Sequence, residues 1–342
     1  MRGVERLRYP DRDVGDQLDM FGAPSASGRK RGIELAELPD TVHALARALP
    51  ERLRMGTSSW TFPGWQDLVW NREASSKTLA SQGLPVYARH PLLRTVGLDR
   101  TYYGPMTAEE LGKLRTGLPE DFRFLVKAHA ECTTVKFGNE SWYRSRAGQR
   151  NELFLEPEYA SEAVVRPFVD GLGAHGGVLL FQFPAQHVPG GARSFATRLE
   201  RFLAALPPGP QLAVEIRNPE LLTPRYVKAL ERVGATHCVV ELPGMPEVAK
   251  QWEVTGGADR PALVMRWMLA RKHQYASAKD AYAPFNRLVD ENPPVRRAFA
   301  EMILATADKP AFLIVNNKAE GSSPLSVLRL AEQLAALCGF EP

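Results

Sequence analysis

The chain has 342 residues, of which 44% are hydrophobic and 24% are charged, and a formal net charge of +4, which is typical of a globular protein with a large core. Its longest apolar run, Gly177–Phe181, is far too short to span a bilayer, and the first residues lack the apolar segment of a signal peptide. Three widely spaced cysteines form no Cys-x-x-Cys pair, which excludes that type of metal or redox motif and favours a reducing cytoplasm.

Residues 1–32 mix Arg, Asp, Gly, Ser and Pro without a helical or strand period, which predicts a flexible tail. The segment GDQLDMFGAP within it nevertheless carries Leu18, Met20 and Phe21. Residues 33–342 are expected to form one folded domain. Its first element is a short helix over Asp40–Leu49, with Asp40 as a plausible N-cap.

Short apolar runs of strand length then alternate with segments of helical period. The eight predicted strands are Leu53–Ser58, Leu93–Leu98, Phe122–Lys127, Gly177–Gln182, Gln211–Ile216, His237–Glu241, Ala262–Trp267 and Ala311–Asn316. Helices between them include Tyr159–Leu172, Ser194–Leu206, Pro224–Val233 and Leu325–Leu337. The pattern predicts an α/β fold, a TIM-type (β/α)₈ barrel with a flexible N-terminal tail. A doubly wound open sheet is the alternative, because strand order cannot be read from one sequence.

In a barrel of this type, the carboxyl ends of the strands form the functional face. Polar residues cluster at these ends or just after them, namely Ser58, Trp60, Trp65, Asp99, Tyr103, Lys127, Gln182, Glu215, Arg217, Glu241, Arg266, Asn316 and Asn317. Glu215 and Arg217 are two residues apart, so they share one face of their strand. With Lys127 and Arg266 nearby, one carboxylate would face three cations, and such a surplus favours binding of an anion such as phosphate.

Two other interpretations of these residues stay open. Glu215 and Arg217 can form a purely structural ion pair that plugs the barrel mouth. Alternatively, a glycosidase would need two carboxylates across a cleft, which Glu215 with Asp99 or Glu241 would supply, with Trp60, Trp65 and Tyr103 stacking on a sugar. In the phosphate interpretation Glu215, Lys127 and Asp99 are the candidate catalytic residues, although the cations around Glu215 should depress its pKa.

The segment His129–Pro157 after the third strand is long enough to be a lid or a binding element. It interleaves basic and aromatic residues, namely Lys136, Trp142, Tyr143, Arg144, Arg146 and Arg150, and Arg271-Lys272-His273 follows the seventh strand. Both loops fall on the predicted functional face and favour nucleic acid as a partner. The seven histidines show no ligand spacing, so neither a metal nor another cofactor is expected.

Seven ordered blocks resemble the YecE-like family, domain of unknown function 72. They are GTSSWTFPGW, YARH with RTVGLDRTYYGPM, FRFLVKA, LLFQFP, LAVEIRNP, VMRW and FLIVNN. The resemblance covers about residues 53–338 and implies a barrel similar to xylose isomerase and endonuclease IV. It also implies a pocket lined by Trp60, Trp65, Tyr103, Lys127, Gln182, Glu215, Arg217, Arg266, Asn316 and Asn317. Relative to that pattern the chain departs at Gly97, Asp99, Thr134, Asn218, Met268-Leu269 and Leu325, where acidic, basic or ligating groups are altered.

The tail segment QLDMF is similar to the short peptide by which many bacterial replication and repair proteins bind the DNA polymerase sliding clamp. Leu18, Met20 and Phe21 would enter an apolar groove while Gln17 occupies a polar pocket. The alternative is that these side chains pack back onto the barrel. Together these features predict a DNA-associated barrel that binds or cleaves a phosphodiester, in the manner of a nuclease-like hydrolase. The alternatives are an enzyme acting on a phosphorylated sugar and a non-catalytic adaptor.

Overall fold

The computed structural model of the chain describes residues 32–139, 141–271, 275–306 and 308–340. Gln17, Leu18, Met20 and Phe21, the residues of the clamp-like segment, lie outside these ranges. No helix in the described ranges combines the length and the apolar character needed to cross a membrane.

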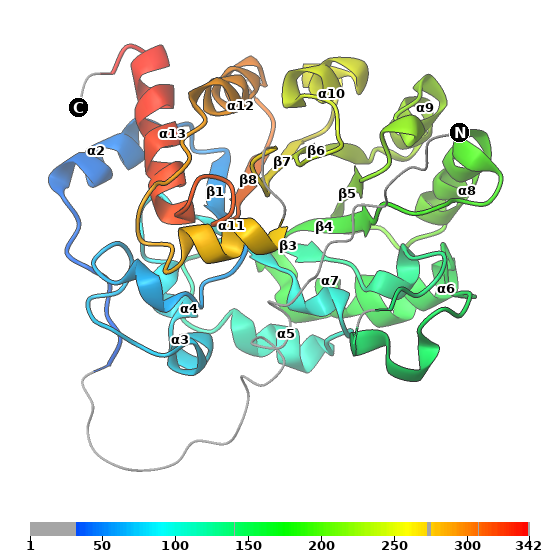
Figure 1. The fold of residues 1–342 in the computed structure, drawn as a ribbon, viewed down its shortest axis with the longest axis horizontal. Coiled ribbons are helices and arrows are strands. Elements are labelled where there is room, and N and C mark those ends of the chain that lie inside the picture. Colours follow the sequence, from blue (N-terminus) through cyan, green and yellow to red (C-terminus); the bar gives the residue numbers. More distant parts are fainter. Residues whose placement is uncertain (1–31, 140, 272–274, 307, 341–342) are drawn as a thin grey trace.

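Eight parallel strands close into a barrel in sequential order, with β8 pairing back onto β1 (Figure 1). The strands are β1 (Leu53–Thr57), β2 (Thr95–Leu98), β3 (Arg123–Lys127), β4 (Gly176–Phe183), β5 (Gln211–Ile216), β6 (Thr236–Glu241), β7 (Leu263–Trp267) and β8 (Ala311–Val315). All eight predicted strands are present, and the TIM-type barrel is confirmed. The closure decides against the open sheet, since Leu53 of β1 is in register with Ala311 of β8.

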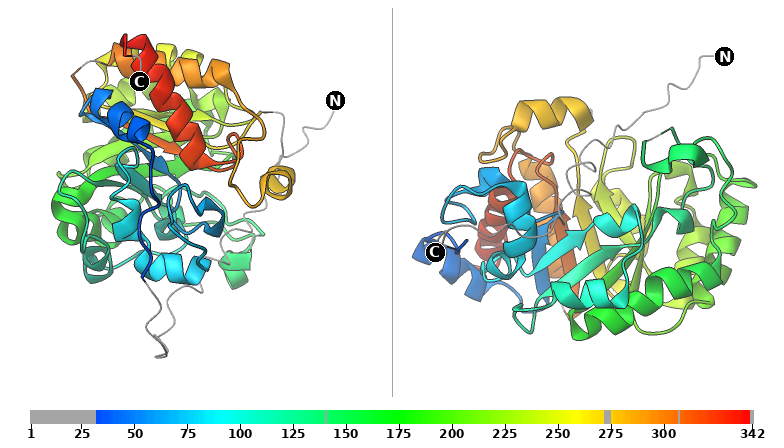
Figure 2. Two further views of the ribbon diagram at one scale, coloured as in Figure 1. Left: turned by 90° about the vertical axis from the view of Figure 1, so that its left-hand side faces the viewer. Right: turned by 90° about the horizontal axis from the view of Figure 1, so that it is seen from below.

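Helices surround the ring of strands (Figures 1 and 2). They are α2 (Asp40–Ala48), α3 (Ser76–Gln82), α4 (Leu84–Tyr87), α5 (Ala108–Leu114), α6 (Pro157–Ala160), α7 (Arg166–Leu172), α8 (Gly191–Ala204), α9 (Pro224–Val233), α10 (Val248–Val254), α11 (Tyr275–Tyr282), α12 (Pro293–Ala305) and α13 (Ser323–Leu337). The helix predicted over 159–172 is interrupted by a π-helical turn, Ser161–Val165. Pro167 follows this turn and has no N–H to donate, which accounts for the break in regular α-helical bonding. Asp40 begins α2 rather than capping it, because Pro39 occupies the N-cap position.

Two apolar layers hold the barrel together. Inside it, a compact cluster is formed by Leu125, Val178, Leu180, Ala213, Cys238, Ala262, Val264, Phe312 and Ile314. The outward side chains of the strands join a larger cluster under the helices. Because both faces of each strand are buried, the strands read as continuous apolar runs, which is why they stand out in the sequence.

The loop after β3, residues 129–157, is tied down rather than open. The side chain of Asn151 donates to the carbonyl oxygens of Glu131 (2.7 Å) and Thr134 (2.6 Å). Gln186, after β4, accepts from the N–H of Val135 (2.8 Å) and donates to the carbonyl of Thr133 (2.7 Å). These bonds fix the base of the loop beside the barrel mouth.

The contact between β1 and β2 requires glycine at position 56. A Cβ atom there would lie 1.8 Å from the carbonyl oxygen of Thr95, which is backbone and cannot move away without disturbing the barrel. We expect Gly56→Ala to lower the free energy of unfolding by about 3 kcal/mol or more in urea titrations. Gly104→Ala is the matched control, since no atom lies within 4 Å of its added Cβ. Equal stability of the two variants would contradict this account of the strand contact.

Candidate functional site

Polar side chains form a layer above the apolar interior of the barrel, at the carboxyl ends of the strands. Along each strand, successive side chains alternate between the two faces. A residue two positions after an inward-facing one therefore also points towards the barrel axis. On seven strands this residue is polar and belongs to the layer. The seven residues are Ser58, Asp99, Lys127, Gln182, Glu215, Arg266 and Asn316. The structure thus brings together seven strand-end residues, the first and last of which lie 258 positions apart in the chain.

A buried ion-pair network lies at the centre of this layer. Nη1 of Arg266 is 2.7 Å from Oε2 of Glu215, and Nε of Arg217 is 2.9 Å from Oε1 of the same carboxylate. Nη2 of Arg266 also lies 3.4 Å and 3.5 Å from the two carboxylate oxygens of Asp99. Arg266 therefore links a carboxylate on β5 to one at the end of β2, with a guanidinium group that is itself buried.

The network sets the protonation of both central groups. Burial alone would raise the pKa of Glu215, but Arg266, Arg217 and, more weakly, Lys127 hold it down at about 2. Burial alone would lower the pKa of Arg266, yet Glu215 and Asp99 raise it. Glu215 is therefore a carboxylate near neutral pH, and its low pKa makes it a poor proton acceptor. This environment suits Glu215 to positioning the two arginines rather than to the proton transfer considered from the sequence.

Lys127 lies at the edge of the network and is 95% buried. Its Nζ stands 3.7 Å from the centroid of the Tyr102 ring, a cation–π contact that stabilises the ammonium form. The hydroxyl of Thr101 donates to the carbonyl of Lys127 (2.6 Å) and fixes the strand end. Asp99 also belongs to the network, so the cations here meet a second carboxylate besides the one that the sequence suggested.

Neutral hydrogen-bonding groups complete the layer. The amide nitrogen of Asn316 donates to the hydroxyl of Ser58 at 3.0 Å, which joins β8 to β1. Gln182 of β4 is in register with Glu215 of β5 and is almost fully buried. Amide and hydroxyl groups beside charged ones give the mouth donors and acceptors for a polyhydroxylated ligand.

Two residues predicted to contact a ligand, Trp65 and Asn317, bond to each other in the structure. Trp65 is fully buried, and its Nε1 donates to Oδ1 of Asn317 at 3.3 Å. The same oxygen accepts from the N–H (2.8 Å) and the hydroxyl (2.7 Å) of Ser323, at the start of α13. Asn317 is likewise buried, so both side chains make their contacts within the protein. An indole in the core needs a hydrogen-bond partner, and Asn317 supplies it.

The other two aromatic candidates lie nearer the mouth. Trp60 lines a pocket beside Asp99, and its Nε1 donates to the carbonyl of Leu79 at 3.1 Å. Tyr103 is half-buried and packs edge-on against Tyr102, with ring centroids 5.3 Å apart. Trp60 is therefore the aromatic candidate that the structure places against an open pocket.

Sequence reasoning missed the partners of two buried acids near the mouth. Glu241 at the end of β6 is bound by Arg271, whose Nε is 2.7 Å from Oε1. Glu131 in the loop after β3 pairs with Arg146. Burial raises the pKa of Glu241 although Arg271 opposes the shift. The sequence analysis treated both arginines as loop cations without their acids, because sequence spacing does not reveal contacts between residues 15 or 30 apart.

The donor set does not suit a metal ion. In the ranges that the structure describes, no three His, Cys, Asp or Glu side chains come together as a metal site would require. The two carboxylates of the mouth, Glu215 and Asp99, both bind the guanidinium of Arg266. Their oxygens are therefore engaged by a cation that the chain itself provides.

Glu215→Gln should reveal the strength of this network through pH. With a pKa of about 2 when folded and an ordinary value near 4.5 when unfolded, Glu215 stabilises the fold above about pH 4.5. We expect the variant to lose about 3 kcal/mol at pH 7, because two guanidinium groups lose their carboxylate. The difference in the free energy of unfolding between variant and wild type, measured in urea titrations, should shrink as the pH falls from 4.5 towards 2. The other carboxylates are the same in both proteins, so their titration does not contribute to this difference. A difference that stays constant over this range would contradict the assigned pKa.

Comparison with known proteins agrees with this architecture. A profile of the family described as "Protein of unknown function DUF72" matches residues 54–339. No curated protein matches the chain. A DUF72 family protein from Thermotoga maritima MSB8 is 17% identical, with a TM-score of 0.55 over 84% of this chain and 99% of that one. A second, from Enterococcus faecalis V583, is 19% identical, with a TM-score of 0.53 over 85% and 96%.

At these identities the solved structures support the fold alone. The family profile spans most of the chain and the whole barrel, from β1 to the end of α13. The family resemblance seen in the seven sequence blocks is therefore confirmed, and the chain belongs to the DUF72 family.

Proposed function

We propose that the barrel mouth binds the phosphate group of a small ligand. The observation that carries this proposal is the convergence of three cations, Lys127, Arg217 and Arg266, around Glu215 at the ends of the strands. Cations gathered in a site partly shielded from water attract an anion strongly, because a low local dielectric strengthens the interaction. A phosphate group suits this role, because Arg binds it bidentately and Lys as a point charge.

Arg217 is the residue through which the ligand would reach the network. Its side chain is 18% exposed, compared with 1% for Arg266, so it lies on the solvent side. The bond from its Nε to Glu215 orients the guanidinium plane. Glu215 and Arg266 are then positioning residues, while Arg217 and Lys127 are the proposed phosphate contacts.

The proposal is for binding rather than cleavage. A nuclease-like reaction would need a group able to accept a proton, and Glu215 has a pKa of about 2. Asp99, the other carboxylate of the mouth, contacts the same guanidinium of Arg266. The electrostatics of the mouth therefore favour holding a dianion over activating a nucleophile.

Charge outside the mouth favours a small ligand over a DNA backbone. Residues 33–342 contain 36 Lys and Arg against 34 Asp and Glu, so the barrel domain is nearly neutral. The loop 129–157 holds four basic residues, but also four acidic ones. Arg146 pairs with Glu131 and Arg150 with Glu152. Tight binding along a phosphate backbone requires many uncompensated cations, so the phosphorylated small molecule is preferred to the nucleic acid favoured from the sequence.

Isothermal titration with ribose 5-phosphate, inorganic phosphate and ribose tests the proposal. We expect the two phosphate-containing ligands to bind and ribose not to bind. Arg217→Ala and Lys127→Met should each weaken binding of ribose 5-phosphate at least tenfold, which corresponds to about 1.4 kcal/mol or more. Arg225→Ala, an exposed change on α9, is the control and should leave binding unchanged.

The same variants separate the two ligand classes. Fluorescence anisotropy with single-stranded and abasic duplex DNA across a salt series should show only weak binding that Arg217→Ala does not change. Saturable DNA binding that falls with Arg217→Ala would overturn the preference for a small ligand. Failure of every phosphate-containing compound to bind would remove the proposal itself.

A further inference from the structure

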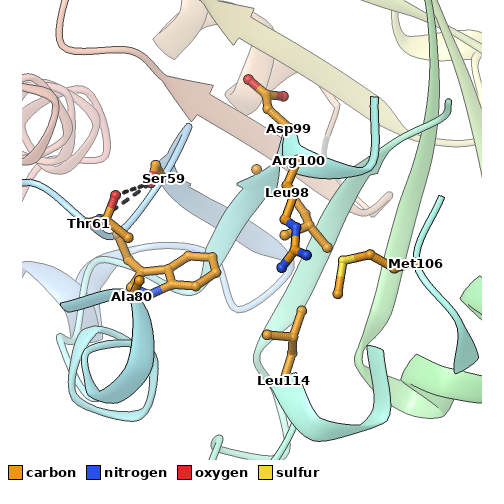
Figure 3. A pocket seen from close by; sticks show the side chains of 10 residues that line it. Ser59, Thr61, Ala80, Leu98, Asp99, Arg100, Met106 and Leu114 are labelled. Atoms are coloured by element: carbon orange, nitrogen blue, oxygen red, sulfur yellow. Dashed lines mark hydrogen bonds between the residues drawn. The ribbon is translucent and has the colours of Figure 1, made fainter. Parts of the chain in front are cut away.

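A pocket opens beside the ion-pair network, between the loop after β1, the end of β2 and helices α3 and α5. It encloses about 410 Å³ of empty space, part of it open to solvent. The lining residues are Ser59, Trp60, Thr61, Ala80, Gly97, Leu98, Asp99, Arg100, Met106 and Leu114 (Figure 3). Most of this lining is apolar, so the pocket differs in chemistry from the charged mouth beside it.

The indole of Trp60 supplies a fixed aromatic wall. Its Nε1 donates to the carbonyl of Leu79 on α3, and 93% of the residue is buried, so the ring is held in one orientation. Gly97 lines the pocket on the β2 side. A Cβ atom there would lie only 3.3 Å from Cγ2 of Ile314 and from Cα of Ser58, so the backbone of β2 is closely packed at this point and is held in place beside the pocket. A rigid aromatic face with room beside it suits a planar ring.

Arg100 gives the apolar pocket a polar end. In Figure 3 its guanidinium extends towards Met106 and Leu114, away from the carboxylate of Asp99. The planar fork of an arginine matches two acceptors on one edge of a ring, as in its bidentate pairing with O6 and N7 of guanine. A sugar ring offers no such pair of fixed acceptors in one plane.

Asp99 connects the pocket to the mouth. It lines the pocket, and its carboxylate contacts Nη2 of Arg266 in the network. A ligand in the pocket would therefore pass Asp99 on its way to Arg217 and Lys127. A carboxylate at this boundary can accept hydrogen bonds from the hydroxyls of a ribose.

We propose that this pocket is the base-binding subsite for a purine nucleotide, with a guanine ring against Trp60 and its O6/N7 edge at Arg100. This inference rests on the proposed function, because the nucleotide's phosphate occupies the mouth at Arg217 and Lys127. Asp99 then lies beside the ribose. The pocket determines which base is bound, and the mouth binds the phosphate.

Isothermal titration with GMP, CMP, ribose 5-phosphate and inorganic phosphate tests the subsite. We expect GMP to bind at least tenfold more tightly than ribose 5-phosphate, and CMP to fall between them. Arg100→Met and Trp60→Ala should reduce GMP to the affinity of ribose 5-phosphate, while binding of ribose 5-phosphate itself stays unchanged. Arg89→Ala, an exposed arginine near the pocket in sequence, is the control.

The outcomes separate the subsite from the function on which it rests. Equal affinity for GMP and ribose 5-phosphate would overturn the subsite and leave phosphate binding intact. Tighter binding of GMP that Arg100→Met does not reduce would also overturn it. Absence of binding by all four compounds would remove the proposed function as well. Arg100→Met keeps the test decisive if Trp60→Ala fails to fold, because Arg100 is not part of the apolar core.

Discussion

The guanidinium of Arg266 is the group on which the mouth of this barrel depends. It is buried at the end of β7 and bonds Glu215 of β5 on one side and Asp99 after β2 on the other. Two carboxylates and an arginine at this depth are costly to desolvate, and only mutual pairing offsets that cost. The pairing joins strands from different parts of the ring, so the geometry of the mouth depends on the closed barrel, and Glu215 stays ionised because of its cationic neighbours.

The candidate site consists of the charged mouth and the apolar pocket beside it, and its polar layer follows from the alternation of inward and outward side chains along the strands. Apolar inward residues fill the barrel, and the next inward position on several strands carries a polar group. Beyond the end of β2, Asp99 of this polar layer also lines the pocket that lies towards α3 and α5. A charged mouth thus adjoins an apolar recess, an arrangement suited to a ligand with an anionic end and a planar end.

Much of this was accessible before the structure. The eight strands were predictable because each is buried on both faces and reads as an apolar run ending in a polar residue. The pairing of Glu215 with Arg217 was predictable from their spacing on one strand. The burial of Trp65 and its hydrogen bond to Asn317 were not predictable. The sequence around a tryptophan in a loop after a strand does not indicate whether its ring faces a ligand or the core. The pairing of Glu131 with Arg146 and of Glu241 with Arg271 was equally hidden, since the partners lie 15 and 30 residues apart in the chain.

The sequence by itself determined where along the chain the strands lie, the family and the kinds of groups that end each strand. These depend on local composition and on periods of two or 3.6 residues, which are written along the chain. Only the tertiary structure decided which charges meet. Asp99 and Arg266 lie 167 residues apart, and their contact changes the balance of charge at the mouth. Contacts of this kind follow from strand register and barrel closure, to which no local pattern in a single sequence corresponds.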